Sequence, residues 1–190
     1  MNTDSLPFGG TMAQRKYVYI ATSLDGFIAG PNGEIDWLEH DSGGEDYGFA
    51  EFIKKIDALI MGSATFKIIT DFAQWHYGDS QMIVMSRRLH ENDILPQFKD
   101  KVSISQGEPS EVLAELQSRG CEQIYVDGGK LVQSFLRAGL IDELIITRFP
   151  VILGGGIPLF GELGKQIELR HLETTSFKSG LIQSNYEVKK

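Results

Sequence analysis

Two junctions in this sequence carry residues that suit the binding of an anion. An apolar run at 58–61 ends at Gly62 before a predicted helix, and a second run at 123–127 meets Gly128 and Gly129 before another. The first N–H groups of a helix have no intrahelical partner, and the helix dipole adds about half a positive charge at that end. A phosphate can therefore bind there without a basic side chain.

A single turn from strand through glycine to helix is more often only tight packing geometry, which is the alternative interpretation of each junction. Two such turns in one chain favour the binding hypothesis, because two helix starts could hold one extended dinucleotide. Glycine at these positions also lets a ligand approach the backbone closely.

Composition narrows the class of protein. The chain has 190 residues, of which 42% are hydrophobic and 23% are charged, and this predicts one domain with one filled core. A net charge of −8 argues against nucleic acid or an anionic membrane as the partner. No apolar run approaches the roughly 20 residues that span a bilayer, and the N-terminus lacks a secretory pattern. We therefore expect a cytoplasmic protein with a small-molecule substrate.

Histidine and cysteine offer no alternative chemistry. The four histidines are scattered without metal-ligand spacing, and no HExxH, CxxC, GxSxG or Walker pattern occurs. The one cysteine, Cys121, follows Gly120 at a predicted helix end, where a packing role is favoured over a nucleophilic one. We therefore predict no metal site and neither a hydrolase nor a metalloenzyme.

The elements that must position the glycine junctions alternate along the chain. Runs rich in β-branched and aromatic residues predict strands at 16–22, 58–61, 81–86, 102–105, 123–127 and 143–149. Helical spacing and helix-end residues predict helices at 47–56, from about 63, from 109 to about 119, and at 130–138. Segments 167–177 and 181–188 predict a β-hairpin. This order predicts an α/β fold with a mixed, mostly parallel sheet, flanking helices and a C-terminal antiparallel hairpin.

Three further segments have distinctive compositions. Residues 1–14 are polar and turn-rich, and we expect a flexible N-terminal extension followed by a single domain at 15–190. The glycine-punctuated loop at 23–34, directly after the first strand, is predicted to be a lid. Three consecutive glycines at 154–156 predict a close approach of the backbone to another group.

Five motifs, in the same order, resemble the dihydrofolate reductase-like superfamily, and more closely the riboflavin-biosynthesis reductase C-terminal domain and its stand-alone bacterial relatives. They are SLDGFIA at 23–29, IMGSATF at 60–66, MSRR at 85–88, VDGG at 126–129, and GLIDEL at 139–144 with PVILGGGIPLF at 150–160. The resemblance covers about 16–188. It implies a three-layer fold, a homodimer, and an NADPH-dependent oxidoreductase similar to dihydrofolate reductase or to 5-amino-6-(5-phosphoribosylamino)uracil reductase.

The resemblance also implies which residues border the cofactor NADPH. The pyrophosphate would lie between Gly62, Ser63, Ala64 and Thr65 on one side and Asp127, Gly128, Gly129, Lys130 and Leu131 on the other. The adenosine would lie beside Ser86, Arg87 and Arg88. The nicotinamide would lie beside Ala21 and the lid residues Leu24, Asp25, Gly26 and Ile28.

One departure from the family pattern bears on the choice between NADPH and NADH. Family members usually carry a basic pair where this chain has Ser63 and Ala64, and an arginine there pairs with the ribose 2′-phosphate. Such a charge-assisted fork contributes roughly 1.5–3 kcal/mol. Arg87 and Arg88 are another source of charge, although two adjacent arginines after a strand are also typical of a solvated edge. NADH therefore stays open as the cofactor.

A reductase of this kind usually needs a proton donor beside the carbon that accepts the hydride. Dihydrofolate reductases use a carboxylate on the helix before the strand that ends here at Gly62, which makes Asp46 the first candidate. Capping of the helix start is its alternative role. Asp36, directly after the predicted lid, is the second candidate.

Candidate substrate residues follow the lid and the last parallel strand. Trp37 could stack on a planar heterocycle, although anchoring of the loop to the core is the alternative. The other candidates are Tyr47, Gly154 and Gly155. No Lys or Arg occurs between 149 and 162, which does not favour a ribose-phosphate substrate.

The glycine junctions predict a dinucleotide site, and the resemblance implies an NAD(P)H-dependent reductase that transfers a hydride to a small pterin- or pyrimidine-like substrate. A non-catalytic nucleotide-binding module on the same fold is the alternative from a different class. A true dihydrofolate reductase is the third hypothesis.

Overall fold

The structure of the chain is a computed structural model that describes residues 13–39, 45–71, 75 and 77–190. Most of the predicted N-terminal extension lies outside the described residues, as do His40 and His76. None of the helices in the described ranges has the length and apolar character that a bilayer crossing requires.

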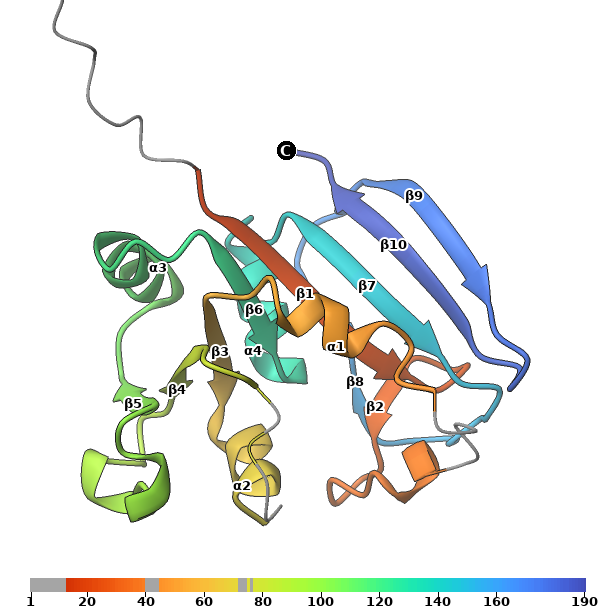
Figure 1. The fold of residues 1–190 in the computed structure, drawn as a ribbon. Helices are drawn as coiled ribbons and strands as arrows, with labels where there is room; N and C mark the ends of the chain where they lie inside the picture. The colour runs from red at the N-terminus through yellow and green to blue at the C-terminus, as the bar shows by residue number, and fades with distance from the viewer. Residues whose placement is uncertain (1–12, 40–44, 72–74, 76) are drawn as a thin grey trace, which may run out of the picture.

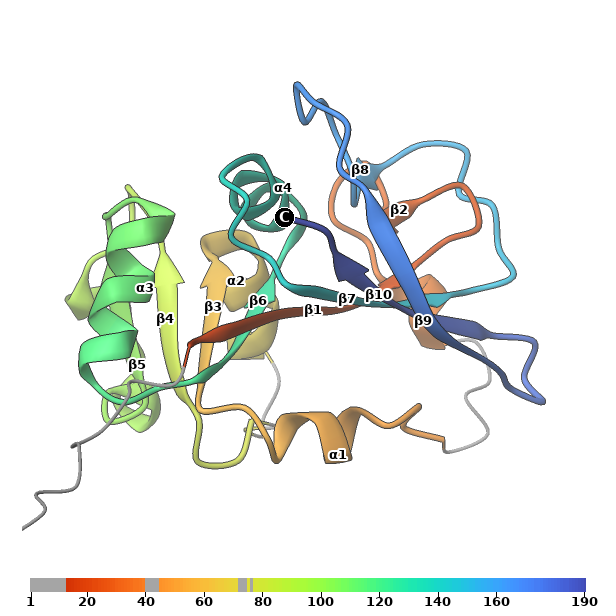
Figure 2. The ribbon, with the colours of Figure 1, turned by 90° about the horizontal axis from the view of Figure 1, so that it is seen from above.

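The described residues form one large sheet with helices on both faces, as Figures 1 and 2 show. The strand order is β5-β4-β3-β6-β1-β7-β10-β9. The first six strands in this order are parallel to one another, whereas β10 is antiparallel to β7 and β9 is antiparallel to β10. The strands are β1 (Arg15–Thr22), β3 (Ala58–Gly62), β4 (Gln81–Met85), β5 (Val102–Ser105), β6 (Gln123–Asp127), β7 (Glu143–Arg148), β9 (Leu169–Ser176) and β10 (Ile182–Val188). The predicted mixed, mostly parallel sheet with a terminal hairpin is confirmed.

The helices form a layer on each side of the sheet. They are α1 (Phe49–Ile53), α2 (Ser63–Asp71), α3 (Pro109–Ser118) and α4 (Gly129–Arg137), with short 3₁₀ helices η1 (Asp36–Glu39), η2 (Glu91–Asp93) and η3 (Pro96–Phe98). Phe135 of α4 and Leu116 of α3 are fully buried on one face, while Phe52 of α1 and Phe66 of α2 pack on the other. Burial of such a side chain contributes about 1.5–3 kcal/mol, so these contacts fix the helices to the strand ends.

Cys121 is buried beside α3, and loss of hydration raises the pKa of its thiol. A buried thiol with a raised pKa is a poor nucleophile, which agrees with the predicted packing role.

The helix predicted at 47–56 is shorter than expected. It spans Phe49–Ile53 because the two residues before it, Tyr47 and Gly48, have φ values of 55° and 89°. Left-handed backbone cannot continue a right-handed helix, so α1 begins only after Gly48.

The loop predicted as a lid contains a strand that the sequence pattern did not indicate. Residues Phe27–Ala29 form β2, which pairs with β8 (Ile157–Pro158) in a separate two-stranded sheet. A Cβ on Gly156 would lie 2.1 Å from the carbonyl oxygen of Ala29. The close approach predicted for the glycine run is therefore made, at Gly156, by β2 of the same chain.

Candidate functional site

The two glycine junctions lie side by side at the carboxyl edge of the sheet. Strands β3 and β6 are parallel neighbours, with Met61 opposite Asp127. Each strand leads directly into a helix, α2 or α4, at the lower edge of the sheet in Figure 1. A Cβ on Gly128 would lie 2.7 Å from Thr65 Oγ1 and 3.9 Å from the backbone nitrogen of Gly62. The unpaired N–H groups of both helix starts are therefore gathered at one place.

The glycines of the two junctions serve different purposes. Gly128 has a φ of 101° and contacts Thr65, while a Cβ on Gly129 would lie 2.8 Å from Ile28 Cδ1. Gly128 is therefore required by its left-handed backbone and its packing, whereas a side chain at Gly129 would displace the end of Ile28 and press on the Pro158 carbonyl oxygen at 3.3 Å. A Cβ on Gly62 would meet nothing within 4 Å, so the absence of a side chain there leaves open space at the start of α2. The open space at Gly62 fits a group that lies against the backbone, such as a pyrophosphate.

Asp127 provides an ionisable group between the two helix starts. Its Oδ1 accepts a hydrogen bond of 2.8 Å from the N–H of Gly128. Burial raises the pKa of this carboxyl to about 6, although the Gly128 N–H and the Tyr125 hydroxyl favour the ionised form. Burial and then the Asp127 charge raise the pKa of Tyr77 and of Tyr125. The resemblance implied a place for Asp127 beside the cofactor, but no residue pattern in the sequence indicated a carboxyl with a raised pKa.

The two carboxylates predicted as proton donors have different environments. Asp46 is exposed, and its carboxylate oxygens accept hydrogen bonds from the N–H groups of Gly48, at 3.0 Å, and Ala50, at 2.9 Å. These two bonds lower the pKa of Asp46, so its carboxylate caps α1 and is ionised at neutral pH. Asp36 is exposed at the first position of η1.

Asp25 joins the loop after β1 to the glycine run before β8. Its Oδ2 accepts a hydrogen bond from the Gly154 N–H at 2.8 Å, and its Oδ1 accepts bonds from the Leu153 N–H and the Ser23 hydroxyl. The Ser23 hydroxyl, followed by the Gly154 and Leu153 N–H groups, lowers the pKa of the Asp25 carboxyl. Asp25 thus positions the two loops predicted to border the nicotinamide and the substrate.

The two aromatic residues predicted at the substrate are engaged in the protein. Trp37 is buried with its ring centroid 5.2 Å from that of Phe149 in an edge-on contact, as expected for a loop anchor. The carbonyl oxygen of Tyr47 accepts hydrogen bonds from the Tyr19 hydroxyl at 2.6 Å and from Gln183 Nε2 at 3.1 Å. Gln183 was not identified from the sequence, because a glutamine in a terminal hairpin carries no signal of its long-range contacts.

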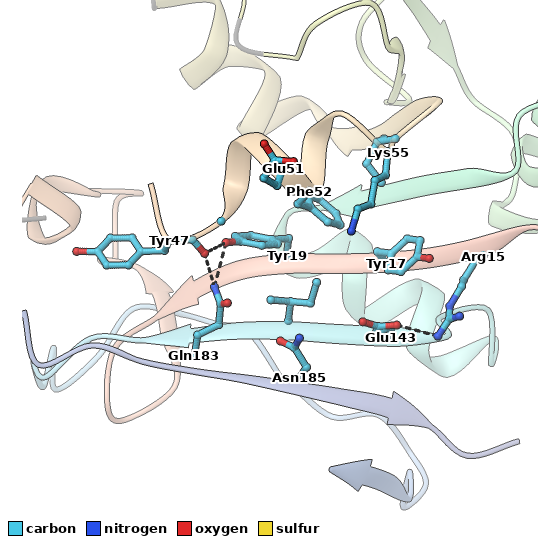
Figure 3. A pocket seen from close by; sticks show the side chains of 13 residues that line it. Arg15, Tyr17, Tyr19, Tyr47, Glu51, Phe52, Lys55, Glu143, Gln183 and Asn185 are labelled. Atoms are coloured by element: carbon cyan, nitrogen blue, oxygen red, sulfur yellow. Dashed lines mark hydrogen bonds and ion pairs between the residues drawn. The ribbon is translucent and has the colours of Figure 1, made fainter. Parts of the chain in front are cut away.

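Figure 3 shows the contacts of Tyr19 and Gln183 with Tyr47 at the edge of a cavity of about 370 Å³ between α1 and the strands β1, β7 and β10. The Tyr47 ring points away from this cavity, whereas Tyr17, Glu143 and Asn185 line it. None of the residues at the two helix starts lines this cavity. It therefore belongs to the face of the sheet, apart from the carboxyl edge.

The residues predicted to border the adenosine directly follow the carboxyl end of β4, beside the end of β5. Ser86 is buried, and its Oγ accepts hydrogen bonds from the N–H groups of Arg88, at 3.1 Å, and Leu89, at 3.0 Å. Arg87 and Arg88 are exposed. Arg87 and Ser86 line a cavity of about 150 Å³ that also reaches Ser134 of α4.

The remaining predicted residues occupy the same edge of the sheet or the loops beside it. Ala21 lies near the end of β1, and Leu24 and Gly26 lie in the loop that follows it. Ser63 and Ala64 are exposed at the start of α2, and Lys130 and Leu131 lie in the first turn of α4. Gly155 lies in the glycine run.

A parallel sheet with two adjacent glycine-led helix starts at its carboxyl edge, closed by an antiparallel hairpin, defines a protein of the dihydrofolate reductase-like fold. The chain belongs to the RibD C-terminal domain family, whose model matches residues 17–183.

Three relatives illustrate this membership. The uncharacterised protein YwjB of Bacillus subtilis (strain 168) is 32% identical over 169 residues, which are 87% of this chain and 94% of YwjB. The riboflavin biosynthesis protein RibD of Corynebacterium ammoniagenes is 27% identical over 147 residues, which are 72% of this chain and 43% of that protein. A crystal structure from Shewanella sp. PV-4, of a protein provisionally assigned to riboflavin biosynthesis, has a TM-score of 0.85 at 36% identity and covers 93% of this chain and 100% of that one.

Proposed function

We propose that this protein is a reductase that uses NADPH, or more weakly NADH, to transfer a hydride to a small pterin- or pyrimidine-like heterocycle. The proposal rests on one observation: Gly62 and Gly128 are neighbours, so two helix starts converge on the same position. Membership of the RibD C-terminal domain family supports it, because a relative with this domain is a riboflavin biosynthesis protein.

The backbone around Gly62 would hold the pyrophosphate. The N–H groups at 63–65 precede the hydrogen-bonded part of α2, and the space beside Gly62 admits an anion to them. The start of α4 would lie on the other side. The dipoles of both helices then favour the negative charge, and Lys130 in the first turn of α4 adds a positive charge at that start.

Arg87 is the residue we propose for the 2′-phosphate that distinguishes NADPH from NADH. It is exposed and lines the cavity at the ends of β4 and β5, whereas Ser63 and Ala64 carry no charge. An arginine binds a phosphate through charge-assisted, commonly bidentate hydrogen bonds.

Reduction of a heterocyclic C=N or C=O bond needs a hydride and a proton. When bound, the nicotinamide cofactor supplies the hydride. We propose that Asp127 holds the proton, because it ends β6, the strand next to β1 with its predicted nicotinamide residue Ala21, and because burial raises its pKa to about 6, which leaves part of this carboxyl protonated near neutral pH. Asp46 is already ionised and occupied as a helix cap, and we assign it to positioning α1.

The Asp25 contacts would order the loops on the substrate side. By joining Leu153 and Gly154 to the loop after β1, Asp25 fixes the segment that we propose covers the nicotinamide. The substrate side lacks a cluster of cations between 149 and 162, so we propose an uncharged or weakly charged heterocycle as the substrate class.

Calorimetric titration with NADPH and with NADH tests the cofactor, and we expect saturable binding with NADPH the tighter ligand. Loss of NADPH absorbance in the presence of a panel of dihydropterins, dihydrofolate and pyrimidines tests the reaction. Absence of both heat and thermal shift with either nucleotide would refute the proposal. Reduction of dihydrofolate alone, sensitive to antifolates, would identify a true dihydrofolate reductase.

A second candidate, a non-catalytic nucleotide-binding module, is favoured by one observation. The carboxylate at the position predicted for the acid, Asp46, is engaged as a helix cap. Nucleotide binding without turnover of any compound in the panel would support this candidate, and turnover of any one of them would exclude it.

A further inference from the structure

The cavity between α1 and the strands β1, β7 and β10, shown in Figure 3, lies apart from both glycine junctions. Its volume of about 370 Å³ falls within the range of about 300–1,000 Å³ that small-molecule sites have. Hydrogen-bonded strands form its floor. Helix α1 is held above them by burial of Phe52 and by the two hydrogen bonds to the Tyr47 carbonyl oxygen. The fold itself therefore shapes this cavity, as is usual for the site of a small ligand.

One wall of the cavity is aromatic. The Phe52 ring of α1 lies edge-on to the Tyr17 ring of β1, with 5.9 Å between the ring centroids. The centroid of the Tyr19 ring lies 4.7 Å from that of Phe52. Ile145 of β7 also lines the cavity and is buried. Rings and aliphatic groups of this kind favour a planar, largely apolar ligand.

Lys55 supplies a charge that the cavity does not neutralise. Its side chain extends from α1 toward the strands in Figure 3, and it forms no ion pair with a carboxylate in the described part of the chain. The other charges of the lining are paired. Arg15 Nη2 lies 2.9 Å from Glu143 Oε2, and Glu51 Oε1 lies 2.5 Å from Lys54 Nζ. One positive charge, that of Lys55, is therefore left at the cavity, which fits a ligand with a single negative charge.

Asn185 provides hydrogen-bonding capacity on the opposite side of the cavity. It is half-buried on β10, and its side-chain amide makes no hydrogen bond with another residue that the structure describes. Gln183, two positions earlier, differs in this respect, because its Nε2 donates to the Tyr19 hydroxyl and to Thr147 Oγ1. A side-chain amide both donates and accepts, so Asn185 suits a ring that carries a heteroatom or an N–H group.

We propose that this cavity binds an aromatic or heteroaromatic monocarboxylate of one or two rings. The ring lies against Phe52 and Tyr17, the carboxylate pairs with Lys55, and a polar atom of the ring forms a hydrogen bond with Asn185. The site is on the face of the sheet and takes a ligand other than the nucleotide, so it goes beyond the proposed reductase function.

Two probes that differ by one charge, indole-3-carboxylate and indole-3-carboxamide, test the proposal. The measurement is a ¹H–¹⁵N NMR titration of the full chain at millimolar probe concentrations. We expect saturable shifts of the backbone amides of Tyr17, Phe52 and Asn185. The carboxylate should bind about fivefold more tightly than the carboxamide, as expected for one partly exposed charge pair.

Variants assign this difference to Lys55. Lys55→Gln should lower the affinity for the carboxylate to that for the carboxamide, and the affinity for the carboxamide should stay the same. Lys99→Gln is the matched control, because it makes the same change in net charge at an exposed lysine that does not line the cavity. Asn185→Leu should weaken the binding of both probes by the same factor, because both carry the ring N–H group.

Equal affinities for the two probes, or shifts that do not saturate, would overturn the proposal. An equal loss of carboxylate affinity in Lys99→Gln and Lys55→Gln would do the same. Shifts confined to 62–65 and 128–131 would place the carboxylate at the helix starts and would also contradict the cavity site. Calorimetry should show that Lys55→Gln binds NADPH as the wild type does. Because the NMR titration contains no nucleotide, failure here and failure of the proposed reductase function are distinguishable.

Discussion

The carboxylate of Asp25 and the backbone N–H of Gly154 form a hydrogen bond of 2.8 Å that connects two loops separated by more than half of the chain. Because the loop after β1 and the glycine run also meet through β2 and β8, this bond completes a small unit at the carboxyl edge of the sheet. The unit lies where the nicotinamide and the substrate are proposed to meet.

Replacement of Asp25 by alanine should loosen this unit without unfolding the domain, because the Asp25 side chain is exposed. We expect faster amide exchange at Leu153 and Gly154 and a KM for substrate raised several-fold. The exposed Glu162→Ala variant is the matched control. Unchanged exchange at both amides would contradict the positioning role.

The same contact predicts a pH dependence. The lowered pKa of Asp25 means that the ionised form is favoured in the folded state, so the contact contributes above the usual aspartate range near pH 4. As pH falls through the lowered folded pKa, the contribution is lost. The exchange rates of the two amides should therefore be constant from neutral pH to about pH 4, after correction for intrinsic rates, and then increase.

Two glycine substitutions should separate packing from binding. Gly128→Ala places a methyl group 2.7 Å from Thr65 Oγ1 at a φ of 101°, and we expect a loss of about 1–3 kcal/mol in the free energy of unfolding. For a chain of this size the melting temperature falls by roughly 2–4 °C for each kcal/mol.

Gly62→Ala should have the reverse effects. Its methyl group meets no protein atom within 4 Å, so stability should change little, whereas nucleotide affinity should fall at least tenfold. Thermal unfolding and calorimetric titration of both variants provide the comparison. A Gly62→Ala variant that binds NADPH as the wild type does would exclude a ligand beside this residue.

Asp127 should make the stability of the protein decrease as pH rises. Its folded pKa of about 6 exceeds the unfolded value near 4, so the folded state binds more protons between these pH values. The contribution of Asp127 to the free energy of unfolding is therefore greatest below pH 4, and this contribution decreases by about 2–3 kcal/mol between pH 4 and pH 7. Urea unfolding from pH 4 to 7 should show this decrease in the wild type and not in Asp127→Asn.

The same variant tests the proposed proton role. Turnover should decrease above about pH 6 in the wild type, and Asp127→Asn should lower kcat more than KM. Asp46→Asn is the comparison, because loss of a helix cap should reduce the melting temperature and leave the shape of the pH profile unchanged. A pH profile shifted by Asp46→Asn instead would reassign the proton to Asp46.

Arg87 should determine the preference for NADPH over NADH. Removal of its guanidinium by Arg87→Ala should weaken NADPH binding by about 10- to 100-fold, as expected for a charge-assisted bond of roughly 1.5–3 kcal/mol. NADH affinity should stay the same, because NADH lacks the 2′-phosphate. An equal loss of affinity for NADPH and NADH would indicate that Arg87 contacts another part of the cofactor. Arg88→Ala, which removes the neighbouring exposed arginine, is the matched control.

Local sequence patterns were sufficient for the eight strands of the large sheet, for the presence of the four α-helices and for their order. The apolar run of β3 and the bracketing of α3 by Pro109 and Gly120 can be read from neighbouring residues, because they depend on burial periodicity and backbone conformation within a few positions. The β2–β8 pair was missed because each strand is short and its partner lies far along the chain. The short α1 follows from a left-handed Tyr47, a conformation that its residue type does not predict.

For the candidate site, the sequence by itself determined which residue types stand at the ends of the parallel strands, including both glycine junctions and Asp127. Only the tertiary structure decided that Gly62 faces open space while Gly128 contacts Thr65, and that Asp46 caps a helix while burial raises the pKa of Asp127. The reason is physical. Helix starts and strand ends arise from local backbone geometry, whereas open space and a shifted pKa depend on groups that folding brings together from distant parts of the chain.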